Sequence, residues 1–122
     1  MRIAIVDDLV NERALLRNRL EQALNGRSVQ TDICEYANGE AFIQAAEKQR
    51  FSAAFLDIYM PGANGIDTAW ALRAFDPDCL LIFTTTSTDH ALEGFQVRAM
   101  HYLVKPFTQK DIDSLTDEML AR

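Results

Sequence analysis

The sequence predicts an α/β fold in which helices cover both faces of a five-stranded parallel sheet. Short apolar runs alternate with segments whose apolar residues recur at helical spacing, and this alternation repeats five times along the 122 residues. The run from Phe51 to Asp57 is almost wholly apolar until its final carboxylate, as expected of a strand that is buried on both faces. No G-x-G-x-x-G sequence follows the first run. The pattern therefore favours the doubly wound strand order 2-1-3-4-5 over half of a dinucleotide-binding fold.

Each element has a local cause in the sequence. The Asp7-Asp8 pair ends the first apolar run, and Asn25-Gly26 is a typical C-terminal stop for the helix that follows. Asn38 and Asn64 are candidate N-caps of later helices. The expected strands span residues 2–6, 29–36, 51–57, 79–85 and 100–104, and the expected helices span residues 9–24, 38–50, 64–75, 89–96 and 108–121.

The apolar residues of each helix predict the side that faces the sheet. In the first helix the inward residues should be Leu9, Leu16, Leu20 and Leu24. In the fourth helix they should be Ala91, Leu92 and Phe95.

Length and composition narrow the class of protein. A chain of 122 residues, 48% of them apolar, is large enough for one domain with a core and too short for two. No apolar run approaches the roughly 20 residues of a membrane span, and the net charge of −6 argues against a DNA-binding surface on this domain. Cys34 and Cys79 lie in separate apolar runs, so we expect buried, reduced thiols. These features predict a cytoplasmic domain without a membrane partner and without direct contact to nucleic acid.

The carboxyl ends of the expected strands bring together three acids, a hydroxyl cluster and an ammonium group. Asp7 and Asp8 follow the first strand, Asp57 ends the third, Thr84-Thr85-Thr86 ends the fourth and Lys105 follows the fifth. In an open α/β sheet, ligands bind at this edge where the strand order reverses. Three neighbouring carboxylates repel one another, so the site should either hold a proton or bind a hard cation. The absence of a nearby His or Cys indicates Mg²⁺ or Mn²⁺ as that cation. Asp57 is then a candidate nucleophile toward a phosphoryl group, with Lys105 and a threonine hydroxyl taking up charge.

These residues resemble those of the receiver domain of bacterial response regulators. The resemblance covers the whole chain, residues 1–122, and rests on Asp7-Asp8, Asp57-Ile58-Tyr59-Met60-Pro61-Gly62 with Gly65, Thr85, and Lys105-Pro106-Phe107. The stretch from Phe83 to Phe107 is more narrowly similar to the receivers of LytTR-type transcription regulators. The resemblance implies a flavodoxin-like doubly wound (βα)5 fold and a part in a two-component phosphorelay.

The resemblance also implies a role for each acid. Asp57 would be the phosphoacceptor, which takes its phosphoryl group from the phosphohistidine of a histidine kinase. Asp8, Asp57 and the carbonyl of Tyr59 would ligate Mg²⁺, with Mn²⁺ as a substitute, and Asp7 would hold a metal-bound water.

The remaining motif residues would contact the phosphoryl group or respond to it. Lys105 would pair with the phosphoryl oxygens, with Lys105-Pro106 as a cis peptide, and the backbone N–H of Thr86 would donate to them. Thr85 would be the switch hydroxyl, and Tyr102 would turn inward when Thr85 moves. The three consecutive threonines leave the register of the switch hydroxyl open between Thr84 and Thr86.

At the scale of the whole protein, the resemblance implies a phosphorylation-operated switch and not an enzyme, although one that assists its own Mg²⁺-dependent phosphorylation and dephosphorylation. The responding face would be the fourth helix, fifth strand and fifth helix, which would form a homodimer. The domain is either a stand-alone receiver or part of a longer protein, and the LytTR-like stretch favours a C-terminal DNA-binding output domain outside this chain. Tyr59, bulky and beside the attack path of water, should lengthen the life of the acyl phosphate.

Three other interpretations fit parts of the pattern. A haloacid-dehalogenase-like phosphatase also uses a strand-end Asp, but Tyr59 stands where its second acid is expected. A flavodoxin-like FMN binder needs a Ser/Thr/Gly-rich phosphate loop after the first strand, which is missing. A receiver that serves only as a binding module would not need the complete set of acids, hydroxyl and lysine.

Overall fold

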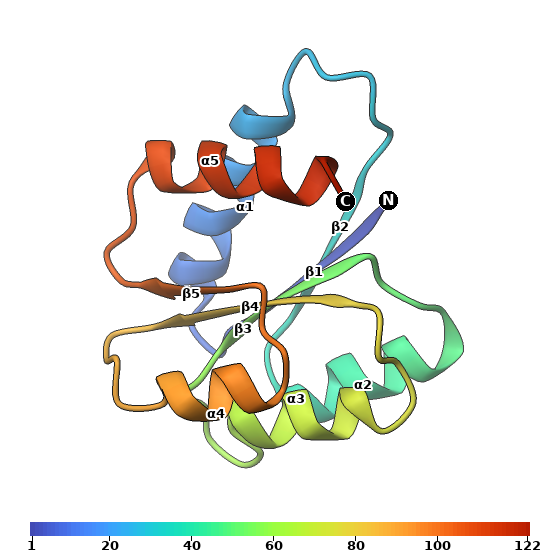
Figure 1. Cartoon of the computed structure of the whole chain (residues 1–122), viewed down its shortest axis with the longest axis vertical. Coiled ribbons are helices and arrows are strands. Elements are labelled where there is room, and N and C mark those ends of the chain that lie inside the picture. Colours follow the sequence, from blue (N-terminus) through green and yellow to red (C-terminus); the bar gives the residue numbers. More distant parts are fainter.

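The sheet at the centre of the molecule has five parallel strands in the order β2-β1-β3-β4-β5 (Figure 1). The computed structural model describes all 122 residues. The strands are β1 (Arg2–Val6), β2 (Asp32–Tyr36), β3 (Ala53–Asp57), β4 (Leu80–Thr85) and β5 (His101–Val104), and the helices are α1 (Val10–Leu24), α2 (Gly39–Lys48), α3 (Gly65–Arg73), α4 (Ala91–Gln96) and α5 (Gln109–Leu120). The predicted alternation and strand order are confirmed.

Two hydrophobic cores lie on opposite faces of the sheet. Helices α1 and α5 lie together on one face, and α2, α3 and α4 cover the other (Figure 1). Alternate side chains of a strand point to opposite faces. Ile3 and Ile5 of β1 accordingly join the core beneath α1 and α5, while Ala4 and Val6 join the second core. All five residues of β3 are buried, which confirms the predicted central strand.

Side-chain caps fix the starts of three helices. The Oδ1 atoms of Asn38 and Asn64 accept hydrogen bonds from the third residues that follow, at 2.8 and 2.9 Å. Thr108 and Asp111 exchange the two hydrogen bonds of a capping box at the start of α5. None of the five helices is long and apolar enough to cross a membrane.

Two expectations at the first half of the chain are wrong. Leu9 is 54% exposed, because it precedes α1 in an extended conformation and does not share the inward face of Leu16, Leu20 and Leu24. The second strand begins at Asp32, where the expected range began at Val29. Its only neighbour is β1, and the parallel register starts with Arg2 opposite Asp32, so the preceding residues have no strand to pair with.

The expected inward side of the fourth helix is also wrong. Leu92 and Phe95 are 66% and 81% exposed, and Gly94 is the buried residue of α4. The helix packs through Gly94, where a Cβ atom would meet Phe83 and Tyr102 at 3.4 and 3.5 Å. Because a bulky side chain at this contact would push the helix away from the sheet, the large apolar residues of α4 point outward.

The cysteines match expectation in part. Both thiols are free, and Cys79 is buried as expected. Cys34 is only partly buried, because it lies on the edge strand β2.

Candidate functional site

The acids predicted to converge do so at the carboxyl edge of the sheet. Asp7 and Asp8 follow β1, and Asp57 is the last residue of the neighbouring strand β3. One carboxylate oxygen from each of the three acids lies within 4.8 Å of the others. The strand order reverses between β1 and β3, so the cluster occupies the point of a doubly wound sheet at which ligands bind.

Two of the three acids are almost inaccessible. Asp7 and Asp57 are only 4% and 5% exposed, whereas Asp8 is closer to solvent. Asp7 Oδ1 accepts a hydrogen bond from the Leu9 N–H at 3.0 Å, which orients the carboxylate just before α1 begins. The main-chain carbonyl of Asp7 accepts from Arg13 Nη1 at 2.7 Å.

The loop that follows Asp57 is fitted closely against the end of β3. Gly65, at the start of α3, donates its N–H to the Ile58 carbonyl at 2.9 Å. A Cβ atom on Gly65 would lie 2.3 Å from the Asp57 carbonyl oxygen, so only glycine allows this approach. The sequence from Tyr59 to Asn64 is thereby bent back over the edge of the sheet.

Lys105 supplies the positive charge at the site. Its Nζ lies 2.9 Å from Asp7 Oδ2 and 3.6 Å from Asp57 Oδ1. A third acid, Glu12 on α1, lies 3.8 Å from the same Nζ. The Lys105-Pro106 peptide bond is cis, as the resemblance implied. The lysine is therefore bound most closely to Asp7, and it sits within reach of Asp57.

Burial and charge act on the protonation of Asp57 and Lys105. Burial, followed by the charge of Asp7, raises the pKa of Asp57 from 3.8 to about 6, although Lys105 pulls it down. Burial alone would lower the pKa of Lys105, but its hydrogen bond to Asp7 and the charge of Asp57 outweigh this, so the pKa is raised. Lys105 is therefore a cation at neutral pH. The ionised form of Asp57 is destabilised by burial and by the charge of Asp7, and a further cation would reduce this destabilisation.

The donor set fits a divalent hard cation. All three clustered groups are carboxylates, and neither histidine belongs to the cluster. Oxygen donors of high charge density are the ligands that Mg²⁺ and Mn²⁺ prefer. The charge that raises the pKa of Asp57 would be compensated by such an ion. That the Tyr59 carbonyl also ligates the cation stays a prediction.

The threonines lie at the end of β4, beside the acids. Thr84 pairs with Asp57 in the sheet register, and Thr85 is fully buried. Thr85 Oγ1 accepts from the Ser87 N–H at 3.3 Å, so its hydroxyl is engaged with the following loop and not with the acids. Thr86 is exposed. The role of each threonine stays a prediction.

Tyr102 lies on β5 and is half-buried against Phe83, with ring centroids 6.2 Å apart. Its hydroxyl donates to the Ser87 carbonyl at 2.7 Å. Ser87 therefore receives contacts from both predicted switch residues, Thr85 and Tyr102.

Sequence reasoning missed two residues near the site, Glu12 and His90. His90 packs its ring against Tyr59, with centroids 5.5 Å apart and the planes at 67°. Neither residue carries a local signal. Glu12 reads as a charged residue in the first turn of an amphipathic helix, and His90 reads as a surface residue beside a short helix.

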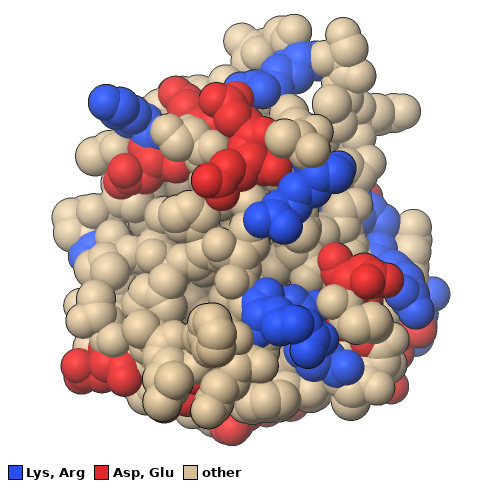
Figure 2. Space-filling model, in the orientation of Figure 1, with Lys and Arg blue, Asp and Glu red and all other residues tan.

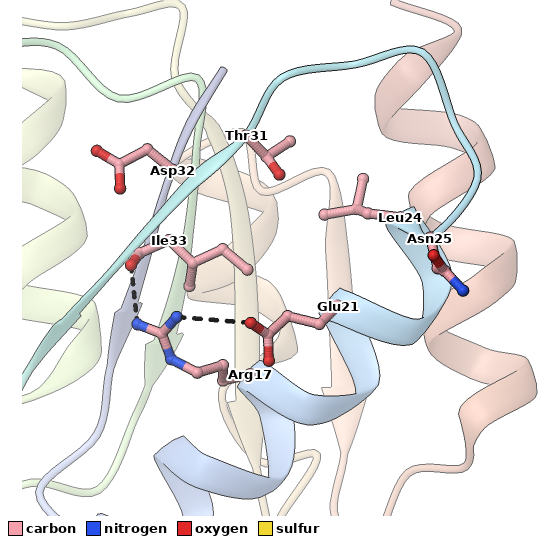
Figure 3. A pocket seen from close by; sticks show the side chains of 7 residues that line it. All are labelled: Arg17, Glu21, Leu24, Asn25, Thr31, Asp32 and Ile33. Atoms are coloured by element: carbon pink, nitrogen blue, oxygen red, sulfur yellow. Dashed lines mark hydrogen bonds and ion pairs between the residues drawn. The ribbon is translucent and has the colours of Figure 1, made fainter.

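A groove elsewhere on the molecule carries no comparable chemistry. It has a volume of about 340 Å³ and lies between α1 and the start of β2 (Figure 3). Its cation, Arg17, donates to the Ile33 carbonyl at 2.8 Å and lies 3.9 Å from Glu21 Oε2. Because the protein's own groups already pair this arginine, we assign the groove no function.

Comparison with known proteins relates both the sequence and the fold to one family. The model of the response regulator receiver domain matches residues 3–117. The sensory transduction protein LytT of Bacillus subtilis is 32% identical over 92% of this chain and 45% of its own length. The transcriptional regulatory protein LytR of Staphylococcus aureus is 28% identical over 99% of this chain and 48% of its own length. The chain thus spans less than half the length of these two curated relatives.

Solved structures relate the chain to the same family. The response regulatory domain of protein mrkE from Klebsiella pneumoniae superposes with a TM-score of 0.83 at 25% identity, over 99% of this chain and 96% of the other. The response regulator TrrA from Thermotoga maritima, solved in complex with Mg²⁺-BeF, superposes with a TM-score of 0.81 at 28% identity, over 97% of both chains.

Proposed function

This chain belongs to the response regulator receiver domain family, and from that premise we propose that Asp57 is its phosphoryl acceptor. Receiver domains are phosphoacceptors of two-component systems that are phosphorylated by histidine kinases, and they are not enzymes in the usual sense. One observation supports the assignment above the others. Of the two buried acids in the cluster, Asp7 is already engaged by the Leu9 N–H at 3.0 Å and by Lys105 Nζ at 2.9 Å, whereas Asp57 Oδ1 lies 3.6 Å from Lys105 Nζ, within reach of the ammonium group but without a close hydrogen bond to it.

The transfer uses groups that the site already orients. The ionised carboxylate of Asp57 attacks the phosphorus of a phosphohistidine, the new bond forms to its oxygen, and the P–N bond breaks. The imidazole nitrogen of the kinase keeps the electron pair and takes a proton. With a pKa of about 6, Asp57 is mostly ionised at neutral pH and can act as the nucleophile. Lys105 lies close to both Asp7 and Asp57, and it stabilises negative charge on the phosphoryl oxygens.

Receiver domains bind Mg²⁺ at an acidic pocket, and we assign Asp8, Asp57 and the Tyr59 carbonyl as its protein ligands here. Asp7 would hold a water bound to the ion. The cation supplies positive charge that offsets the repulsion among the carboxylates. Mn²⁺ substitutes because it prefers the same oxygen donors. With these groups the domain assists its own phosphorylation and dephosphorylation.

Phosphorylation reaches the surface through Thr85. Its hydroxyl now accepts from the Ser87 N–H. When it turns to a phosphoryl oxygen, that hydrogen bond is lost and the loop around Ser87 can shift. The Thr86 N–H donates to the phosphoryl group, and Tyr102, whose hydroxyl is tied to the Ser87 carbonyl, turns inward. The response is a two-state change biased by a local charge.

The surface that responds is the face formed by α4, β5 and α5. It carries three of the exposed large apolar side chains, Leu92, Phe95 and Val104. Figure 2 shows few charged side chains over α4 compared with the acidic cluster over α5. We assign this face as a phosphorylation-dependent homodimer interface, and we place DNA binding in an output domain of the whole protein. Transcription control by LytR-like relatives supports the second assignment.

Sedimentation of the phosphorylated domain tests the interface. Phe95→Glu should reduce dimer formation by the phosphorylated chain, because a carboxylate would be buried against its copy. Trp70→Glu, a similar change at a residue 49% exposed on α3, is the matched control. Equal loss of dimer in both variants would contradict the assignment of this face.

The acceptor is tested with a small phosphodonor such as acetyl phosphate and Mg²⁺. The wild type should gain one phosphoryl group, Asp57→Asn should gain none, and Asp67→Asn, which changes an exposed acid on α3, should behave as the wild type. A wild type that gains none would favour the binding-only receiver. Rapid turnover of phosphate esters would revive the phosphatase interpretation, and a yellow purified protein would revive the FMN interpretation.

A further inference from the structure

Tyr59 stands two residues after the proposed acceptor, and its side chain has a specific partner. Tyr59 is 48% exposed, and its ring contacts the imidazole of His90 edge-on, with centroids 5.5 Å apart. The two residues come from different loops, one after β3 and one after β4. A contact of this kind restricts a half-exposed ring that would otherwise move freely between rotamers.

His90 is not using its side chain to cap the helix. It occupies the N-cap position of α4, yet it makes no side-chain capping hydrogen bond. Its Nδ1 lies 3.4 Å from Glu93 Oε2, one turn into the helix. The imidazole thus lies near Glu93 on its own helix and contacts the ring of Tyr59.

The loop that carries His90 is also bonded to the proposed switch residues. Ser87 donates its N–H to Thr85 Oγ1 and accepts from the Tyr102 hydroxyl at 2.7 Å. The Asp89 N–H donates to Ser87 Oγ at 3.1 Å, directly before His90. A continuous set of contacts therefore runs from Thr85 through Ser87 and His90 to Tyr59.

We propose that His90 is a positioning residue that holds the Tyr59 ring over the approach to Asp57 and so slows hydrolysis of the phosphorylated domain. In hydrolysis, water attacks phosphorus, the bond to the Asp57 oxygen breaks, and the carboxylate and inorganic phosphate are released. A Tyr59 ring fixed by His90 obstructs the incoming water. The inference rests on the proposed function, since it requires a phosphoryl group on Asp57.

The consequence is a link between the switch and the lifetime of its own signal. When Thr85 turns to the phosphoryl group, the Ser87 N–H loses its partner and the loop shifts at Ser87, while the contact between His90 and Tyr59 is kept. The position of α4 then determines how well Tyr59 covers the site. A partner that binds α4 should change the lifetime of the phosphoryl group through the same contact.

The test measures loss of the phosphoryl group after the phosphodonor is removed, with Mg²⁺ present. His90→Ala should hydrolyse about 2- to 12-fold faster than the wild type, the range that corresponds to the loss of one aromatic pair. His90→Phe should restore a rate close to the wild type, because it retains a ring to contact Tyr59. Trp70→Ala, which removes an exposed aromatic ring from α3, should leave the rate unchanged.

A double-mutant cycle separates positioning from a general structural effect. If His90 acts through Tyr59, adding His90→Ala to Tyr59→Ala should leave the rate of the Tyr59→Ala variant unchanged, whatever the size of the effect of His90→Ala alone. Multiplying effects in the double variant, an unchanged rate in His90→Ala, or failure of His90→Phe to restore the rate would each overturn the inference. These outcomes leave the acceptor role of Asp57 intact. Failure of the wild type to gain a phosphoryl group would overturn the proposed function and this inference with it.

Discussion

At the scale of single residues, the site depends on one carboxylate kept in an unfavourable place. Asp57 is 5% exposed, and burial together with Asp7 raises its pKa to about 6. Lys105 lowers that pKa, but its single ammonium group interacts with three acids, Asp7, Asp57 and Glu12. One ammonium group among several acids leaves a net negative charge in the cluster. This residual charge is what a metal ion and a phosphoryl transfer site require.

The raised pKa makes a prediction about stability without metal. A carboxyl group with a raised pKa stabilises the folded state while it is protonated, fully below its ordinary pKa of 3.8, and this contribution is lost as the pH rises through about 6. Asp57→Asn should therefore raise the free energy of unfolding at pH 7.5 by about 1–3 kcal/mol. Urea unfolding at several pH values measures the gain, which should shrink as the pH falls from 6 toward 4.

Asp67→Asn is the control for that measurement, because it removes an exposed charge outside the cluster. It should change the free energy of unfolding by no more than about 0.5 kcal/mol. A gain from Asp57→Asn that is the same at pH 4 and pH 7.5 would show that repulsion in the cluster is not its cause.

At the scale of elements, the acids are placed by how strands and helices begin and end. The position of Asp57 depends on the contact between the end of β3 and the start of α3, where Gly65 meets the Asp57 carbonyl. The position of the switch loop depends on α4, which has six residues and packs through Gly94. Both contacts are made by helical glycines, but a Cβ atom would lie much closer to its neighbour at Gly65 than at Gly94.

The two glycines give a matched pair of predictions. Gly65→Ala places a Cβ 2.3 Å from a backbone oxygen and should lower the free energy of unfolding by about 1–3 kcal/mol, because the backbone must shift. Gly94→Ala meets only side chains at 3.4 Å or more, and alanine favours a helix over glycine by up to about 1 kcal/mol, so it should be close to neutral. Thermal unfolding of both variants checks this, and equal destabilisation would refute the explanation.

The elements also show where sequence patterns are informative. Alternation, caps and strand ends sufficed to place Asp7, Asp8, Asp57, Thr85 and Lys105 on one edge, because each of these signals is local or follows from topology. The patterns failed for Leu9, Leu92 and Phe95, where an apolar residue at helical spacing was taken as buried. Burial on α4 was decided by how closely Gly94 allows the helix to approach β4 and β5. That distance is a tertiary property.

At the scale of the whole molecule, the doubly wound sheet brings residues from both ends of the chain together. Lys105 and Asp7 are 98 positions apart in the sequence, yet the Nζ atom of one lies 2.9 Å from the Oδ2 atom of the other. That Lys105 binds Asp7 more closely than Asp57 could not be predicted from strand ends, because it depends on side-chain lengths across the edge. The same holds for Glu12 and for the pairing of His90 with Tyr59.

Because the acids come from two strands, binding of a cation should stabilise the whole fold. Mg²⁺ at about a hundredfold excess over its Kd should add about 2.7 kcal/mol to the free energy of unfolding. Mn²⁺ should act likewise, whereas Asp8→Asn and Asp57→Asn should lose most of the effect. Thermal unfolding with NaCl at matched ionic strength as the control measures this. An equal rise in Tm for the wild type and both variants would place the bound ion elsewhere.

The central claim is that Asp57 carries the phosphoryl group, and locating the group tests it most directly. The wild-type domain is treated with acetyl phosphate and Mg²⁺, reduced with borohydride, which converts an aspartyl phosphate to homoserine, and mapped by peptide mass spectrometry. The account predicts homoserine at position 57 and at no other aspartate. Homoserine at Asp7, Asp8 or an exposed aspartate with position 57 unchanged would contradict it.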